Sequence, residues 1–403
     1  KARRKEPFYE IDTRCILLFA TMALAGEDVM SLNLMPMPKS VQLDDGEFVL
    51  DDSFTIGVRG IEDMRIFDAA TRVLHRLKNR TGLFLPQQVI VPDKPVENPD
   101  LLISVQRVES VTLGMDEAYQ LTITPEKIEL TAETDIGAQR GMETFLQLLS
   151  VNDGNYVFPA LTINDEPRFA WRGLLIDVCR HWQPVEVIKR NLDAMAAVKM
   201  NVLHWHLTED QGFRVECKTF PKLHLEGSDG LYYTHHQIKD IIEYAADRGI
   251  RVVPEFDIPG HSTSWFVGYP EFASLPGPYE IEREWGIMDP TFDPTLEATY
   301  KFFDEFFKEM TALFPDEYVH IGGDENNGKQ WDANPDIQAF MKDRGIKDNH
   351  ALQAFFNQRI LDILTRFDKK MMGWEEILQP EMPTNIMIQS WRGRESLVEA
   401  AEK

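Results

Sequence analysis

Gly173-Leu-Leu-Ile-Asp177 is a short apolar run that ends in an ionisable residue, and the chain repeats this pattern in Val202-Leu-His-Trp-His206 and Arg251-Val-Val-Pro-Glu255. Runs of this length and composition are typical of buried strands. Residues 185–198 and 236–248, which follow the first two runs, have the apolar spacing of helices. Strands that alternate with helices in this way predict a parallel sheet.

The same alternation continues to the end of the chain. Further helices are expected over 299–314 and 351–367, and further strands over 318–321, 371–374 and 386–390. Polar residues gather where the strands end, which is typical of a TIM-type (β/α)8 barrel. We therefore expect a barrel domain over residues 166–403, with about six βα units present. A doubly wound sheet is the alternative, although no glycine-rich phosphate loop follows the first strand.

The preceding part of the chain has a different pattern. Short strands are expected at 48–50, 101–105 and 118–124, and amphipathic helices over 66–77 and 137–149. Because the strands are grouped rather than strictly alternating with helices, residues 26–165 are expected to form a small α+β domain.

The first 25 residues have the pattern of a secretory signal. Basic residues at positions 1, 3, 4 and 5 precede the apolar run Cys15–Ala25, which ends in small residues at Ala23 and Ala25. This apolar run is too short to span a bilayer, because a membrane-spanning helix needs about 20 residues. We therefore predict a signal segment over 1–25, no membrane span, and an exported protein that is periplasmic, cell-surface or extracellular. A buried N-terminal helix is the alternative.

The charge balance limits the partners. The chain has 42 Lys and Arg residues against 66 Asp and Glu residues, a formal net charge of −24. A polyanion would be repelled, so nucleic acid and anionic membrane surfaces are poor partners. A neutral or amino-bearing small substrate suits this charge, and so does a secreted protein that needs only solubility. The sequence predicts no oligomeric state.

The strongest candidate site is His320-Ile-Gly-Gly-Asp324-Glu325, at the end of an expected strand. Two glycines let the backbone bend closely beneath a ligand, and two adjacent carboxylates then project into the barrel mouth. Adjacent acids can diverge in pKa, so that a poorly solvated one stays protonated as a general acid while its ionised neighbour stabilises positive charge. A helix N-cap with an acidic first turn is the alternative.

Other strand ends add polar and aromatic side chains. The polar ones are Arg180, Glu209, Asp210 and His261. Trp374 and Trp391 end the last two expected strands. Aromatic faces stack on the apolar faces of sugar rings, so two tryptophans beside paired acids favour a carbohydrate pocket.

Five ordered stretches resemble the family 20 glycoside hydrolases, the β-N-acetylhexosaminidases. They are Trp171-Arg-Gly-Leu-Leu-Ile-Asp-Val-Cys-Arg-His181, Asn201-Val-Leu-His-Trp-His-Leu-Thr-Glu-Asp-Gln-Gly212, Pro254-Glu-Phe-Asp-Ile-Pro-Gly-His261, His320-Ile-Gly-Gly-Asp-Glu325 and Gly373-Trp-Glu375. The resemblance covers residues 167–403, and the domain before them looks like the one that precedes the barrel in this family. It implies removal of terminal β-linked N-acetylglucosamine or N-acetylgalactosamine from glycans or chitooligosaccharides, with no metal and no other cofactor.

The resemblance also implies a role for each acid. Glu325 would be the general acid and then the base, and Asp324 would orient the substrate's 2-acetamido group, which attacks through an oxazolinium intermediate with retention. Most glycosidases instead use two enzyme carboxylates. His261 would hydrogen-bond Glu325 and be held in turn by residue 209. Glu209 stands where many members have Asp, and Asp210 follows it, so the extra methylene decides which acid reaches the histidine.

For the sugar itself, the resemblance implies that Arg180 grips the hydroxyls and that Trp374 and Trp391 enclose the acetamido methyl. The chain ends at Lys403, in the helix expected after the sixth strand. The resemblance therefore implies that strands seven and eight are missing, as in a truncated gene product or fragment.

Two other functions stay open at this point. His204-Trp-His206 places two imidazoles on the same side of a strand. Together with His261, His320 and Asp324 they could supply the ligands of a zinc-dependent barrel hydrolase. A sugar-binding fragment without turnover would keep the arginine and the tryptophans as its binding surface.

Overall fold

The computed structural model describes residues 32–402, which form two compact units. The first unit contains residues 32–110 and 114–170. The second contains residues 111–113 and 171–402. The predicted signal segment, residues 1–25, lies outside the described residues.

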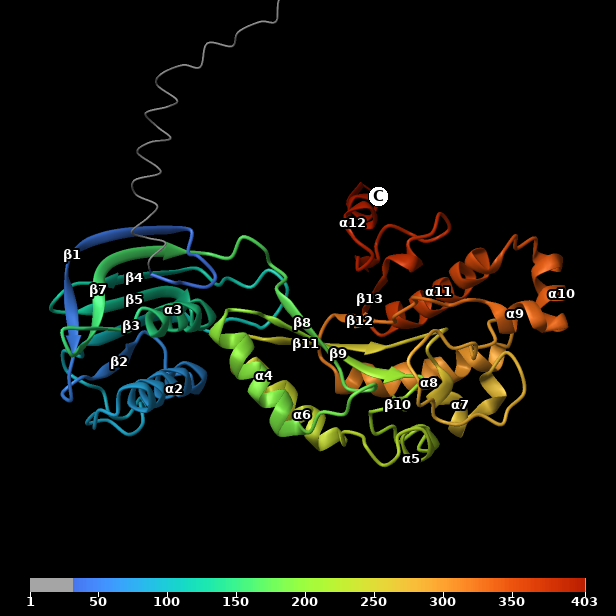
Figure 1. Cartoon of the computed structure of the whole chain (residues 1–403), viewed down its shortest axis with the longest axis horizontal. Helices are drawn as coiled ribbons and strands as arrows, with labels where there is room; N and C mark the ends of the chain where they lie inside the picture. The colour runs from blue at the N-terminus through green and yellow to red at the C-terminus, as the bar shows by residue number, and fades with distance from the viewer. Residues whose placement is uncertain (1–31, 403) are drawn as a thin grey trace, which may run out of the picture. The chain divides into compact units, whose positions relative to one another are not determined.

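The first unit is built on a mixed sheet (Figure 1). Its strands are β1 (Ser40–Leu50), β2 (Ile56–Arg59), β3 (Leu101–Arg107), β4 (Tyr119–Ile123), β5 (Ile128–Thr134), β6 (Ser150–Asn152) and β7 (Asn155–Asp165). They lie in the order β1-β7-β4-β5-β3-β2, with β6 beside β7. Only the pairs β2–β3 and β3–β5 are parallel. The sheet is larger than the three strands that the sequence predicts.

Two helices pack on this sheet, α2 (Met64–Thr81) and α3 (Asp135–Gln147). The side chain of Asp63 accepts the backbone N–H of Arg65 and caps the start of α2. Thr134 caps α3 in the same way. α2 buries one apolar face, whereas α3 is buried along almost its whole length, and the two predicted helices are confirmed.

The second unit contains six parallel strands, which confirms the predicted barrel-type sheet. They are β8 (Gly173–Asp177), β9 (Val202–Glu209), β11 (Arg251–Phe256), β12 (Tyr318–His320), β13 (Lys370–Trp374) and β14 (Met387–Gln389). They lie in the order of the sequence, and β10 (Gly212–Phe213) pairs with the end of β9. Every residue of β9 and β11 is buried, including polar ones such as His204, His206 and Glu255, so both faces of these strands are covered.

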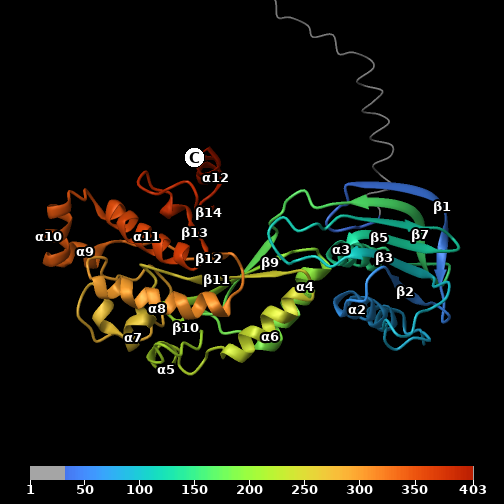
Figure 2. The same ribbon diagram turned by 180° about the vertical axis from the view of Figure 1, so that it is seen from behind.

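Helices connect these strands. They are α4 (Val185–Ala197), α5 (Lys222–Glu226), α6 (His235–Ala246), α7 (Thr263–Gly268), α8 (Glu297–Leu313), α9 (Lys329–Ala333), α10 (Pro335–Arg344), α11 (Asn349–Arg366) and α12 (Arg394–Glu402), with the short 3-10 turns η1 (Pro270–Phe272) and η2 (Glu375–Ile377). In Figure 2, α4 lies beside α6, and α8 lies near α11. Within residues 32–402, no helix has the length and apolar content needed to cross a bilayer.

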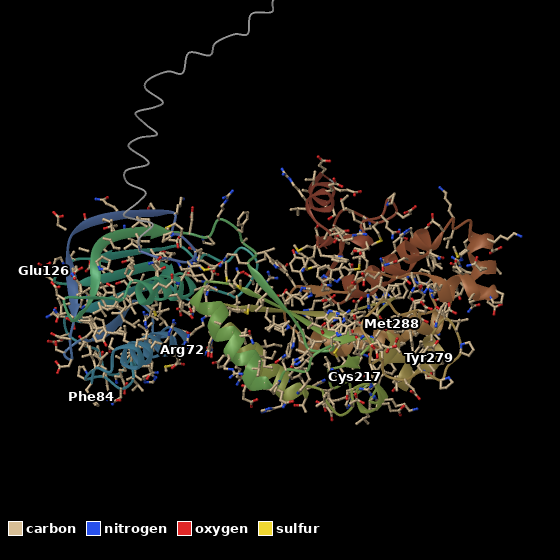
Figure 3. The ribbon with its side chains drawn as sticks, in the orientation of Figure 1. Arg72, Phe84, Glu126, Cys217, Tyr279 and Met288 are labelled. Carbon is tan, nitrogen blue, oxygen red and sulfur yellow. The ribbon has the colours of Figure 1, made fainter. Side chains whose placement is uncertain are left out.

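Aromatic residues dominate the core between the strands and α8. Phe306 of α8 is fully buried, and its ring lies 5.0 Å from Trp265 and 5.1 Å from Phe256, centroid to centroid, in edge-on contacts. Such contacts add to the free energy of burial. Cys217, labelled in Figure 3, and Cys179 are free, buried thiols of the same unit.

We expect Phe306→Ala to destabilise the second unit by about 3–5 kcal/mol, because it leaves a cavity among aromatic rings. Urea unfolding followed by tryptophan fluorescence measures this unit alone, since all 8 tryptophans lie at or after Trp171. Leu225→Ala is the control, because Leu225 is 62% exposed and its truncation should change stability by less than about 0.5 kcal/mol. Equal unfolding midpoints for the two variants would contradict this description of the core.

Candidate active site

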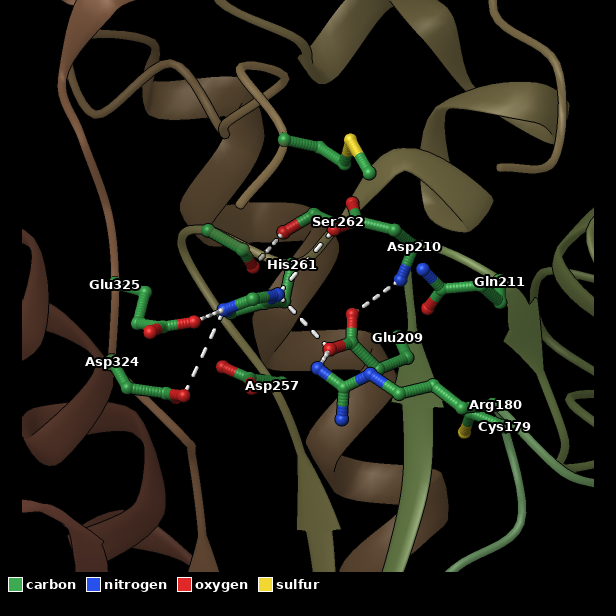
Figure 4. Close-up of polar contacts among 12 residues, drawn as sticks. Cys179, Arg180, Glu209, Asp210, Gln211, Asp257, His261, Ser262, Asp324 and Glu325 are labelled. Carbon is green, nitrogen blue, oxygen red and sulfur yellow. Dashed lines mark hydrogen bonds and ion pairs between the residues drawn. The ribbon is translucent and has the colours of Figure 1, made fainter. Parts of the chain in front are cut away.

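The paired acids lie on the loop that follows β12 (Figure 4). Gly322 and Gly323 precede them with φ of 66° and 88°, in the left-handed region that favours glycine. Any larger residue would also clash with its neighbours at both positions. A Cβ on Gly322 would lie 1.8 Å from Asp257 Oδ1, and a Cβ on Gly323 would lie 2.3 Å from Ile377 Cγ2. The two glycines therefore let the loop pass directly against Asp257.

Asp257 is a site residue that is not among the predicted catalytic and binding residues. It is 1% exposed, accepts the backbone N–H of Gly323 at 3.2 Å, and shares a hydrogen bond with Asp324. Burial, together with the negative charge of Asp324, raises the pKa of Asp257 well above its usual range. Asp257 therefore keeps its proton and donates it in the hydrogen bond to Asp324.

The two adjacent acids differ in solvation. The side chain of Asp324 is 16% exposed and that of Glu325 is 32% exposed. Burial raises the pKa of Asp324, while the charge of His261 and the hydrogen bond from Asp257 oppose that rise. The less solvated acid is thus Asp324, so the simple expectation that poor solvation marks the general acid does not select Glu325.

His261 lies between the acid pair and two further carboxylates. Its Nε2 is 3.5 Å from Glu325 Oε2 and 3.7 Å from Asp324 Oδ2. Its Nδ1 is 2.9 Å from Glu209 Oε1 and 3.4 Å from Asp210 Oδ2. Both acids proposed to hold the histidine therefore reach it, and Glu209 is the nearer. Figure 4 shows the ring between Glu325 and Asp324 on one side and Glu209 on the other.

These carboxylates keep His261 charged. Burial alone lowers the pKa of an imidazole, but the hydrogen bond to Asp210 and the negative charges of Asp324 and Asp210 raise the pKa of His261 to about 10. His261 and Glu325 both have φ of 50°, which non-glycine residues adopt only where the surroundings hold them. The site is therefore a fixed imidazolium facing the acid pair.

Arg180 follows β8 and is fixed by two acids. Its Nη1 lies 2.9 Å from Asp177 Oδ2, and its Nη2 pairs with the buried carboxylate of Glu209. Glu209 thus contacts both Arg180 and His261. The ring of Trp285 lies 5.7 Å from the Arg180 guanidinium carbon and is 79% exposed, so this indole is a rim residue that the sequence did not single out.

The two predicted pocket tryptophans are held differently. Trp374 is the last residue of β13, and its indole N–H donates to Glu255 Oε1 at 3.0 Å. Trp391 lies two residues beyond the end of β14, so the prediction that it ends a strand is wrong. It is half exposed, and its indole N–H donates to Glu376 Oε2 at 3.3 Å.

The ligand set predicted for a zinc-dependent hydrolase does not converge. His204 Nε2 and His206 Nδ1 lie 2.6 and 2.7 Å from Glu255 Oε2, and His320 Nδ1 lies 3.2 Å from Glu255 Oε1. These are hydrogen-bonding distances between the groups themselves. His261 belongs instead to the separate cluster with the acid pair. The prediction that all of these residues share one ion is therefore wrong.

His261, Asp324 and Glu325 come close enough together to be considered as ligands. A ligating imidazole must be neutral, however, and the pKa of His261 is raised to about 10. An ion at this cluster would therefore have to displace the proton of His261.

Two sequence profiles match the chain. Residues 169–403 match the catalytic domain of glycosyl hydrolase family 20, and residues 31–166 match domain 2 of the same family. Among curated relatives, the β-hexosaminidase of Porphyromonas gingivalis is 34% identical over 386 residues, 92% of this chain and 48% of that protein. The β-hexosaminidase subunit alpha of Rattus norvegicus is 36% identical over 94% of this chain and 74% of its own length. The chain thus spans about half the length of the first of these relatives.

Solved structures agree with the sequence matches. The chitobiase of Flavobacterium johnsoniae is 47% identical with a TM-score of 0.89, over 92% of this chain and 58% of that one. The exo-β-N-acetylglucosaminidase of Vibrio harveyi, solved with N-acetylglucosamine, is 28% identical with a TM-score of 0.76, over 92% of this chain and 59% of that one. With both of its units matched, this chain belongs to glycosyl hydrolase family 20.

Proposed function

We propose that the protein removes terminal β-linked N-acetylglucosamine or N-acetylgalactosamine from glycans or chitooligosaccharides, with the substrate's acetamido oxygen as the nucleophile. The observation that carries the proposal is the arrangement of Asp324 between a protonated Asp257 and the His261 imidazolium, next to the more exposed Glu325. The hexosaminidases and the N-acetylglucosamine complex among the relatives support the same substrate.

Asp324 is the group that acts on the acetamido group. The hydrogen bond from Asp257 and the positive charge of His261 favour its ionised form against the effect of burial. As a carboxylate it accepts the acetamido N–H, turns the carbonyl oxygen toward the anomeric carbon, and offsets the positive charge of the oxazolinium ion. The substrate oxygen forms the bond to the anomeric carbon while the bond to the leaving group breaks.

Glu325 moves the proton. It is the more exposed acid, at the side of the site that a leaving group and an incoming water can reach. It donates its proton to the glycosidic oxygen as that bond breaks, and it then takes a proton from the water that opens the oxazolinium ring. His261 lies 3.5 Å from it and is held on its far side by Glu209, so the imidazolium orients the carboxyl between the two steps.

Arg180, Trp374, Trp391 and Trp285 provide the sugar contacts. The guanidinium is fixed by Asp177 and Glu209 and offers its remaining N–H groups to sugar hydroxyls. Trp374 and Trp391 enclose the acetamido methyl group of the substrate. The exposed indole of Trp285 forms the rim of the site beside Arg180.

We expect Glu325→Gln to lower kcat on N,N′-diacetylchitobiose by about 10²–10⁴-fold with little change in KM, because only proton transfer is lost. The loss should be smaller on a nitrophenyl N-acetylglucosaminide, whose leaving group needs less protonation. EDTA should leave the parent rate unchanged. Parent protein that binds N-acetylglucosamine in calorimetry without hydrolysing either substrate would instead identify a binding protein, and EDTA-sensitive turnover would identify a metal enzyme.

The charge of His261 should make folding depend on pH. Its folded pKa of about 10 is above the ordinary value of 6.5, so the folded state binds the extra proton between these values. This stabilisation is complete below pH 6.5 and is lost as the pH rises through 10. Relative to His261→Gln, the stability of the parent should therefore fall from pH 7 to pH 9, by up to about 1.4 kcal/mol per pH unit. If the stability of both proteins changed equally with pH, the conclusion that His261 is a buried imidazolium would be refuted.

We propose further that the protein is exported, which rests on the basic and apolar pattern of residues 1–25. Expressed in a bacterial host behind an initiating Met, the chain should be recovered from the periplasm without these residues. A form that begins at residue 26 should stay in the cytoplasm. Recovery of the full chain from the cytoplasm, with residues 1–25 still attached, would overturn the proposal.

A further inference from the structure

Neighbouring parallel strands place ionisable residues side by side beneath the site. Asp177 of β8 is the register partner of His206 on β9, His206 is the partner of Glu255 on β11, and Glu255 is the partner of His320 on β12. Register partners on adjacent strands point to the same side of a sheet. The four side chains therefore form one row across the sheet, and the proposed reaction gives no step to Glu255 or to the imidazoles.

Glu255 is the centre of this row. It is fully buried, and its Oε2 lies 2.6 Å from His204 Nε2 and 2.7 Å from His206 Nδ1. Its Oε1 lies 3.2 Å from His320 Nδ1 and accepts the indole N–H of Trp374 at 3.0 Å. A buried carboxylate is costly unless hydrogen bonds and charges offset its desolvation, and four groups do so here.

Opposite charges alternate along three of the four residues in the row. Burial raises the pKa of Glu255, but the positive charge of His206 and the hydrogen bond from His204 hold that pKa well below its usual range. Burial lowers the pKa of His206, but the charges of Glu255 and Asp177 raise it overall. Burial lowers the pKa of His320 to about 4, so this ring is neutral at neutral pH. The row thus contains an anionic Glu255 beside a cationic His206, and His206 in turn faces Asp177.

The two ends of the row contact Trp374 and Arg180, which are sugar contacts in the proposed reaction. An indole has a single N–H donor, so the bond to Glu255 fixes how the ring of Trp374 is turned. The ring also packs edge-on against His320, with centroids 4.9 Å apart. At the other end, Asp177 binds Arg180 through Nη1 and accepts its backbone N–H at 3.1 Å.

We propose that Glu255 is a positioning residue that fixes the indole of Trp374 against the acetamido group. Through His206 and Asp177, it also links the position of this indole to the position of Arg180. The inference rests on the proposed function, because Trp374 and Arg180 are the sugar contacts of that reaction. Glu255 is fully buried, so its effect should appear in substrate binding and should require the indole.

A double-mutant cycle tests this coupling. Glu255→Gln should raise KM for a nitrophenyl N-acetylglucosaminide about tenfold, with a smaller change in kcat. In a Trp374→Phe background, which lacks the indole N–H, the same substitution should change KM less than about twofold. An equal fold-change in KM on Glu255→Gln in both backgrounds would overturn the proposal. If Glu255→Gln does not fold, His206→Gln removes the central cation and should show the same dependence on Trp374.

A second measurement does not need turnover. In the parent, NMR titration should give His206 a pKa above 6.5, and Glu255→Gln should lower that pKa and shift the indole N–H resonance of Trp374. Glu117→Gln is the matched control, because this 3% exposed carboxylate of the first unit pairs with Arg140 at 2.6 Å, and its removal should change neither signal. Unshifted His206 and Trp374 signals in Glu255→Gln would overturn the proposal. Shifted signals in a protein without hydrolysis would refute the proposed function and leave the positioning intact.

Discussion

The second unit depends on one constraint: ionisable side chains buried where parallel strands end must neutralise one another. Water cannot reach them, so each charge needs a partner or must give up or keep a proton. The carboxylate of Glu209 is the clearest case, since it binds Arg180 on one side and His261 on the other. Both partners are thereby held at fixed places around the mouth of the site, and neither is free to turn away from a ligand.

The same constraint produces two adjoining clusters with different chemistry. Around the acid pair, Asp257 keeps a proton and His261 carries a positive charge, so the pKa of Asp324 rises less than burial alone would raise it. Around Glu255, the histidines and Trp374 surround a carboxylate that stays ionised and fully buried. The first cluster faces the solvent through Glu325 and can react. The second holds the indole of Trp374 through Glu255.

The sequence was sufficient for the features that depend on burial alone. β9 and β11 are buried on both faces, so these strands could be located directly from their apolar residues. In the first unit, β1 is mostly exposed and lacks such a run, so only its last three residues were predicted as strand. The acid pair was found because two glycines precede it.

The sequence could not assign the partners of the buried charges. Asp257 and Glu255 are two acids separated by one residue, yet one keeps its proton beside Asp324 and the other binds three histidines. That difference depends on residues up to 119 positions away, as in the bond between Trp374 and Glu255. His204 and His206 resembled metal ligands for the same reason, since their acidic partner lies on a neighbouring strand.

The central claim is that the substrate's own acetamido oxygen attacks the anomeric carbon while Asp324 holds that group in place. The most direct measurement is kcat/KM for a series of nitrophenyl glucosaminides whose N-acetyl group carries zero, one, two or three fluorines. Fluorine withdraws electrons from the carbonyl oxygen, so the rate should fall steeply with each substitution. A rate that does not depend on the fluorine count would contradict the account, because the bond to the anomeric carbon would then be formed by another nucleophile.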